Sequence, residues 1–74
     1  MMGFHKYQSP NRQLTTRQEL ILQMASEGNT RVQISKLLFI APQTVKSHLT
    51  NIHHKLDTQN TTEAVAKAIR THQI

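Results

Sequence analysis

The sequence predicts an all-α domain of four short helices, and three observations support this fold class. Apolar residues recur at helical spacing in four separate segments, each preceded by a residue or turn suited to start a helix. The second and third of these segments are joined by so short a connection that the chain must turn sharply, as in a helix-turn-helix unit. No segment shows the alternation of a strand. We therefore expect residues 14–74 to form one domain.

Residues 1–13 are polar, contain Gly3 and Pro10, and show no apolar period. A segment that offers so little apolar surface has no means of burying itself. We expect a flexible arm there, in front of the domain.

The first helix is expected to begin at Thr15. Thr15 and Gln18 have the spacing of a capping box, in which the hydroxyl and the amide each satisfy an N–H at the helix start. Gly28 suits the left-handed conformation that closes a helix. The expected buried face consists of Leu20, Ile21, Met24 and Ala25.

The second helix is short and starts with another capping-box pair, Thr30 and Gln33. Pro42 then suits the first position of a third helix, and it disfavours helical geometry at Ala41. Phe39 lies in the turn between these helices and is expected to cover the core. The expected buried stripe of the second helix is Val32, Ile34, Leu37 and Leu38.

The third helix, from Pro42 to about Leu56, has the clearest pattern. Its apolar stripe consists of Val45, Leu49, Ile52 and Leu56. The opposite face contains no acidic residue, and every side chain on it can form hydrogen bonds. That face carries Gln43, Lys46, Ser47, Thr50, Asn51 and His54.

The fourth helix follows a polar connection over residues 57–61. Asn60 can cap it, with Glu63 three residues further on. Its apolar side consists of Ala64, Val65, Ala68 and Ile69. We expect Val65, Ala68 and Ile69 to contact a second copy of the chain, with packing on the first helix as the alternative.

The charge of the chain favours a polyanionic partner. Nine Lys and Arg residues against four Asp and Glu give a net charge of +5, with nucleic acid as the first candidate and an anionic membrane surface as the second. No apolar run approaches the roughly 20 residues of a membrane span, and the first residues lack the apolar stretch of a signal peptide. A cytoplasmic location is expected.

Catalysis, metal binding and cofactor binding are not expected. The chain has no cysteine, no glycine-rich phosphate loop and no paired carboxylates on one helix face. Its five histidines include no pair at the i, i+4 spacing of a helical metal site. We expect a non-enzymatic protein in which His48 is partly buried.

The acid-free face of the third helix has the chemistry that reads DNA. Lys donates to guanine O6 or N7, and Asn or Gln pairs with adenine, in a major groove that accommodates an α-helix. Threonine hydroxyls and backbone N–H groups can hold phosphates that set the docking register. The candidate DNA-binding residues are Thr30, Gln43, Thr44, Lys46, Ser47, Thr50, Asn51, His54 and Lys55.

Several short motifs, in this order and spacing, resemble the LuxR/FixJ-type (GerE-like) helix-turn-helix domain of bacterial regulators. The resemblance runs from Leu14 to Ala66. Its most specific part is the run from Thr44 to His48, followed by Lys55-Leu56. The other motifs are Leu14-Thr15-x-Arg17, Glu27-Gly28, Ile34-x-x-x-Leu38-x-Ile40 and Glu63-Ala64-Val65.

The resemblance implies base contacts by Lys46, Ser47 and Thr50, and positions near the DNA backbone for Thr30, Thr44, Asn51 and Lys55. It implies that the fourth helix often serves self-association. The chain departs from the family where a Glu is replaced by Leu20, an Arg by Thr61, a turn glycine by Phe39 and a capping Ser by Ala41.

We therefore expect a sequence-specific regulator that binds double-stranded DNA as a homodimer, with the third helix in the major groove. The alternative is a protein-interaction module that pairs with a larger LuxR-type regulator and modulates it. Another transcription regulator or RNA polymerase is a further partner class. RNA or membrane-surface binding fits less well, because aromatic residues for base stacking are few.

Overall fold

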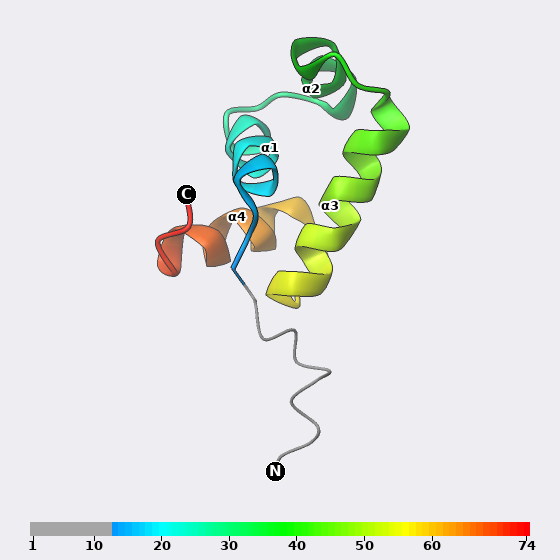
Figure 1. The fold of residues 1–74 in the computed structure, drawn as a ribbon. Coiled ribbons are helices and arrows are strands. Elements are labelled where there is room, and N and C mark those ends of the chain that lie inside the picture. Colours follow the sequence, from blue (N-terminus) through cyan, green and yellow to red (C-terminus); the bar gives the residue numbers. More distant parts are fainter. Residues whose placement is uncertain (1–12) are drawn as a thin grey trace.

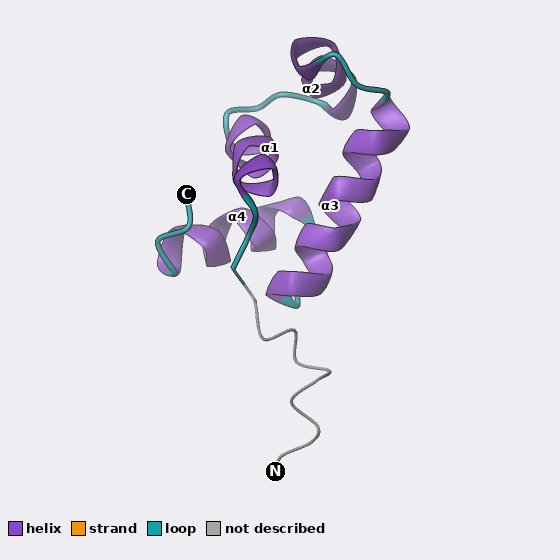
Figure 2. Cartoon of the chain, in the orientation of Figure 1, coloured by secondary structure: helices purple, strands orange, loops and turns teal. Residues whose placement is uncertain are grey.

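A computed structural model describes residues 13–74 and shows four helices around one core (Figure 1). Their bounds are α1 (Thr16–Ser26), α2 (Arg31–Leu38), α3 (Pro42–Leu56) and α4 (Thr61–Arg70). Between residues 13 and 74 there is no strand (Figure 2), so the all-α prediction is confirmed. The arm predicted over residues 1–13 lies outside the described residues, apart from Gln13.

The two predicted capping boxes are both present. The Thr15 hydroxyl accepts a hydrogen bond from the Gln18 N–H at 3.1 Å, and the Gln18 side chain accepts one from the Thr15 N–H at 2.9 Å. Thr30 and Gln33 repeat this arrangement at 3.1 and 2.7 Å. These reciprocal bonds satisfy N–H groups that a helix start otherwise leaves unpaired, and they fix where α1 and α2 begin.

The ends of α1 and α2 differ in the residue that turns the chain. Gly28 follows α1 with a φ of 93°, as predicted, and the Asn29 N–H donates back to the Met24 carbonyl at 3.2 Å. At the end of α2 the same left-handed region is occupied by Phe39, with a φ of 59°. Its side chain is 92% exposed, so the expectation that Phe39 covers the core is wrong. Ile40 packs against the core instead.

The buried face of α1 is rotated from the predicted one. Leu20 is 41% exposed, whereas Leu22 is completely buried together with Ile21. The buried positions begin at Gln18, which carries a polar side chain because it completes the capping box. A pattern built from apolar residues alone therefore omits Gln18, and the buried face that it predicts is rotated about the helix axis.

The buried face of α2 is narrower than predicted. Ile34 is buried and Leu38 packs partly against the core, but Val32 and Leu37 are exposed. Ser35 takes a buried position, where its hydroxyl donates to the Val32 carbonyl at 2.7 Å. A helix of two turns has room for few inward positions, and a small side chain with a satisfied hydroxyl fills one of them.

The predicted bounds and apolar stripe of α3 are confirmed. Val45 and Ile52 are completely buried, Leu56 is 2% exposed, and Leu49 packs partly against the core. Pro42 stands at the first position of the helix, after Ala41 in extended conformation. This stripe lies against α1, α2 and α4, and it therefore fixes the rotation of α3 about its own axis.

Short side chains bring α4 close to the rest of the domain. Ala64 and Ala68 are completely buried, and α4 packs against both α1 and α3. Asn60 caps the helix as predicted, accepting from the Glu63 N–H at 2.9 Å. Ile69, assigned to the apolar side, is 55% exposed.

Candidate nucleic-acid interface

The face of α3 opposite its core stripe is open to solvent. Its residues recur about every three to four positions along the helix, as positions 43, 47, 50 and 54 do, with the others beside them, so they lie on one side of the helix. The predicted DNA-binding residues that are exposed on α3 are Gln43, Thr44, Lys46, Ser47, Thr50, Asn51 and His54. Because the stripe packs on the other three helices, the polar residues of the opposite face are exposed. The ribbon of α3 runs along one edge of the domain (Figure 1).

The two remaining predicted residues lie at the edges of this surface. Thr30 is exposed and caps α2. Lys55 is half-buried near the end of α3, and its ammonium donates to the Gln13 carbonyl at 3.2 Å. An ammonium has three donors, so this bond leaves Lys55 able to contact a phosphate as well.

Charge is distributed unevenly between the helices. The helices α2 and α3 contain no Asp or Glu, while four basic residues lie on them. The acidic residues are Glu19 and Glu27 in or next to α1, Asp57 after α3, and Glu63 on α4. The basic residues of α2 and α3 are Arg31, Lys36, Lys46 and Lys55. A polyanion is therefore attracted to the α2–α3 side of the domain.

Two hydroxyl groups on this surface already have defined partners. The Thr50 hydroxyl donates to the Lys46 carbonyl at 3.0 Å, which leaves its oxygen free to accept from the amino group of a base. The Thr30 oxygen accepts from the Gln33 N–H, which leaves its hydroxyl hydrogen free to donate to a phosphate. Thr50 is thus suited to a base edge and Thr30 to the DNA backbone.

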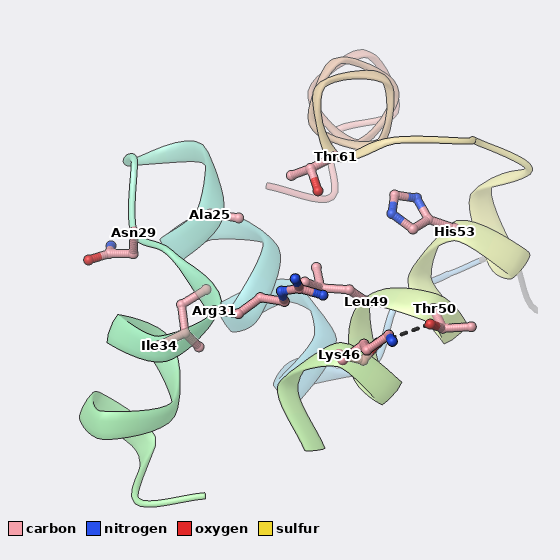
Figure 3. A pocket seen from close by; sticks show the side chains of 9 residues that line it. All are labelled: Ala25, Asn29, Arg31, Ile34, Lys46, Leu49, Thr50, His53 and Thr61. Atoms are coloured by element: carbon pink, nitrogen blue, oxygen red, sulfur yellow. Dashed lines mark hydrogen bonds between the residues drawn. The ribbon is translucent and has the colours of Figure 1, made fainter. Parts of the chain in front are cut away.

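Beside this surface is an open hollow of about 430 Å³, lined from the end of α1, α2, α3 and the start of α4 (Figure 3). We call it the basic hollow, because Arg31, Lys46 and His53 line it and no acidic residue does. Its other lining residues are Ala25, Asn29, Ile34, Leu49, Thr50 and Thr61. The basic hollow shares Lys46 and Thr50 with the exposed face of α3.

Sequence reasoning missed Arg31, His53 and Thr61 as members of one site. Each belongs to a different helix, and no motif or spacing relates them. The position of each residue depends on how α2 and α4 pack on α3, which the sequence pattern does not give.

The residues predicted for self-association have different environments. Val65 is half-buried and packs against the core, and Ile69 is exposed. Ala68 is completely buried inside its own domain, so it is not available to a second copy. Only part of the predicted surface on α4 can therefore contact another molecule.

Two further kinds of site were searched for in the described part of the chain. Within 13–74 no three His, Cys, Asp or Glu side chains gather as metal ligands would. In the same range none of the helices combines the length and the hydropathy that a membrane span requires.

Comparison with known proteins places this geometry in context. The model of the family "bacterial regulatory proteins, luxR family" matches residues 12–68. The chain is 43% identical over 65 residues to the transcriptional regulatory protein LiaR of Bacillus subtilis (strain 168), covering 88% of the chain and 31% of LiaR. It is 50% identical over 56 residues to the quorum sensing-dependent regulator RpaR of Rhodopseudomonas palustris, covering 76% of the chain and 23% of RpaR.

A solved structure supports the same grouping. The response regulator ChrA of a heme-sensing two-component system matches with a TM-score of 0.83 and 36% identity, over 96% of this chain and 36% of ChrA. In each comparison the chain spans less than half the length of the protein it matches.

Proposed function

Because the chain belongs to the luxR family of bacterial regulatory proteins, we propose that it regulates transcription by reading the sequence of duplex DNA with the exposed face of α3. The observation that carries this proposal is the division of α3 into a buried stripe and an acid-free polar face. The stripe anchors the helix, and the polar face presents donors and acceptors to base edges.

The exposed side chains of α3 suit different parts of the DNA. Lys46 donates to the O6 or N7 of guanine, and Ser47 and Thr50 contact neighbouring base edges. Thr30, Thr44, Asn51 and Lys55 lie next to the strands and contact phosphates, which sets the position of the helix along the groove. Gln43 and His54 extend the same face at its two ends.

The proposal is tested by selection from random-sequence duplex DNA at about 150 mM salt, where nonspecific phosphate binding is weakened. We expect one short motif to be enriched over several rounds. Binding of the pool without enrichment would show that the domain relies on charge alone. No binding even at low salt would contradict DNA binding altogether.

We also propose that two copies act together, placing their third helices in successive major grooves. Such a pair requires half-sites about 34–36 Å apart, or a multiple of that distance. The exposed Ile69 and the half-buried Val65 on α4 support this contact, because burial of exposed aliphatic surface against a partner has a favourable free energy.

Sedimentation of the free domain at high concentration tests the dimer. We expect a dimer for the natural chain and a monomer for Ile69→Lys, with Leu37→Lys as the control because it also places a charge on an exposed Leu position. A natural chain that stays monomeric and binds DNA singly would contradict the dimer. If the Ile69→Lys variant is still a dimer, the contact between the two copies lies elsewhere.

A second candidate function uses the same exposed position on α4. If Ile69 contacts a larger LuxR-type regulator instead of a second copy, the chain modulates that regulator. The exposure of Ile69 supports this function as well. Modulation of another regulator does not, however, require the acid-free face of α3. Mixed sedimentation with such a regulator distinguishes the two partners.

A further inference from the structure

We propose that the basic hollow beside α3 is a binding site for one phosphate group. The inference deepens the proposed function and rests on it, since with α3 in the major groove the phosphate nearest to the hollow belongs to the DNA backbone. It assigns a binding role to Arg31 and His53, two residues outside the predicted DNA-reading face.

The first argument is that the cationic side chains of the hollow have no acidic partner. Arg31 and Lys46 both line the hollow, and within residues 13–74 neither side chain has a hydrogen-bond or ion-pair partner. No Asp or Glu is among the lining residues. Two cations that share an open space without an acid between them repel each other, and a phosphate placed between them removes that repulsion.

The second argument is the setting of His53. Its Nδ1 lies 2.9 Å from the Thr58 hydroxyl oxygen, and this bond holds the half-buried ring in place. The other ring nitrogen, Nε2, then remains for a ligand, and Figure 3 shows the ring at the side of the hollow across from Arg31. When Nδ1 accepts from Thr58, the neutral ring carries its hydrogen on Nε2 and can donate it to a phosphate oxygen.

The third argument is the fit of the space. The hollow has about 430 Å³, and a water molecule occupies roughly 30 Å³ in the liquid. The hollow therefore has room for a phosphate group together with several waters. Thr61, at the start of α4, adds a hydroxyl on the far wall.

The fourth argument is position. Lys46 and Thr50 belong both to the hollow and to the exposed face of α3. A phosphate seated in the hollow is therefore directly beside the residues proposed to read bases. A charged group held at this place fixes the register of α3 in the groove.

The test compares Arg31→Gln and His53→Leu with Arg17→Gln, which removes the same charge as Arg31→Gln from an exposed position on α1. The affinity of the whole 74-residue chain for duplex DNA is measured over a range of salt concentrations. We expect Arg31→Gln to lose about tenfold in affinity equally on all sequences, with the salt slope reduced by about one, while Arg17→Gln changes little. His53→Leu, which keeps the bulk of the side chain but removes the donor, should weaken binding in the same uniform way.

A second measurement separates the source of the phosphate. Inorganic phosphate is added to the protein in sulfate-free buffer at constant ionic strength. The backbone NMR chemical shifts of Arg31, Lys46 and His53 are followed during the titration. Saturable shifts there indicate that free phosphate enters the hollow. Loss of DNA affinity without such shifts indicates that the hollow takes a phosphate only from bound DNA.

The proposal is overturned if Arg31→Gln and Arg17→Gln bind DNA equally and phosphate causes no shifts. It is also overturned if Arg31→Gln weakens binding while His53→Leu does not, because the phosphate then lies outside the hollow. Thermal unfolding of each variant shows whether the fold is retained, and Arg31→Lys should restore part of the affinity. If the natural chain does not bind DNA, the proposed function fails, whereas the phosphate titration still tests the hollow.

Discussion

The side-chain oxygen of Gln73 accepts a 2.6 Å hydrogen bond from the backbone N–H of Leu14. Leu14 is 5% exposed and precedes α1, and Gln73 follows α4, so the bond joins the two ends of the domain across 59 positions of sequence. The Gln73 N–H in turn donates to the Ala68 carbonyl at 2.8 Å. The residues after α4 are thus part of the folded unit, and they satisfy a partly buried backbone donor.

Replacing Gln73 with Ala should lower the free energy of unfolding by about 1 kcal/mol, because the Leu14 N–H then loses its acceptor. Chemical denaturation measures the change. Gln23→Ala is the matched control, since its amide donates to Glu27 on an exposed surface at 3.3 Å and should have little effect. Equal stabilities for the two variants would show that the bond between the ends is not significant.

The left-handed conformation of Phe39 provides a second prediction. A non-glycine residue costs about 1–2 kcal/mol in this region, and the Phe39 side chain is 92% exposed and gives no burial in return. Phe39→Gly should therefore stabilise the domain by about 1 kcal/mol and raise its Tm by roughly 4–8 °C.

Gly28→Ala is the matched opposite change. Gly28 has a φ of 93°, and a Cβ added there meets no atom within 4 Å, so the substitution introduces backbone strain alone. It should destabilise the domain by about 1 kcal/mol. If Phe39→Gly also destabilised the domain, Phe39 would have a packing role that its exposure does not suggest.

The missing side-chain cap of α3 can be supplied. Ala41 has the extended conformation of a capping residue, but its methyl group accepts no hydrogen bond. In Ala41→Ser the hydroxyl can accept from the N–H of Gln43 or Thr44, with an expected gain of about 1 kcal/mol. Ala41→Val adds bulk without an acceptor and should give no gain. Thermal unfolding compares them, and equal melting temperatures would argue against a capping effect.

Ile52 and Leu37 are both helical aliphatic residues, but one side chain is buried and the other is exposed. Ile52 is completely buried on α3, so Ile52→Ala should cost about 2–5 kcal/mol. Leu37 is 56% exposed on α2, and Leu37→Ala should change stability by no more than about 0.5 kcal/mol. Comparable losses in denaturant titrations would mean that the outward assignment of Leu37 is incorrect.

Signals carried by neighbouring residues predicted the fold well. The capping boxes at Thr15 and Thr30, the glycine at position 28 and Pro42 mark helix ends through bonds within a few residues. Their geometry is local and needs no knowledge of the rest of the chain. The long stripe of α3 was also predictable, since four apolar positions in fifteen residues define one direction.

Features that depend on packing were not predictable in this way. Gln18 concealed the direction of the α1 face because its polar side chain serves a cap while its position is buried. Phe39 was expected to cover the core from the turn, yet it is exposed in the left-handed turn and Ile40 packs against the core instead. The basic hollow is lined by residues of all four helices, and no spacing within one segment indicates it.

The central claim is that the exposed face of α3 reads bases, and Lys46→Ala tests it most directly. The variant is titrated on the selected duplex and on duplexes with one base pair changed at a time, with Lys36→Ala as a control that removes the same charge from α2. We predict a loss of about 1–3 kcal/mol for Lys46→Ala and relaxed preference at one base pair, while Lys36→Ala keeps every preference. A Lys46→Ala variant that weakens equally on all duplexes would contradict the claim, because Lys46 would then contact only phosphate.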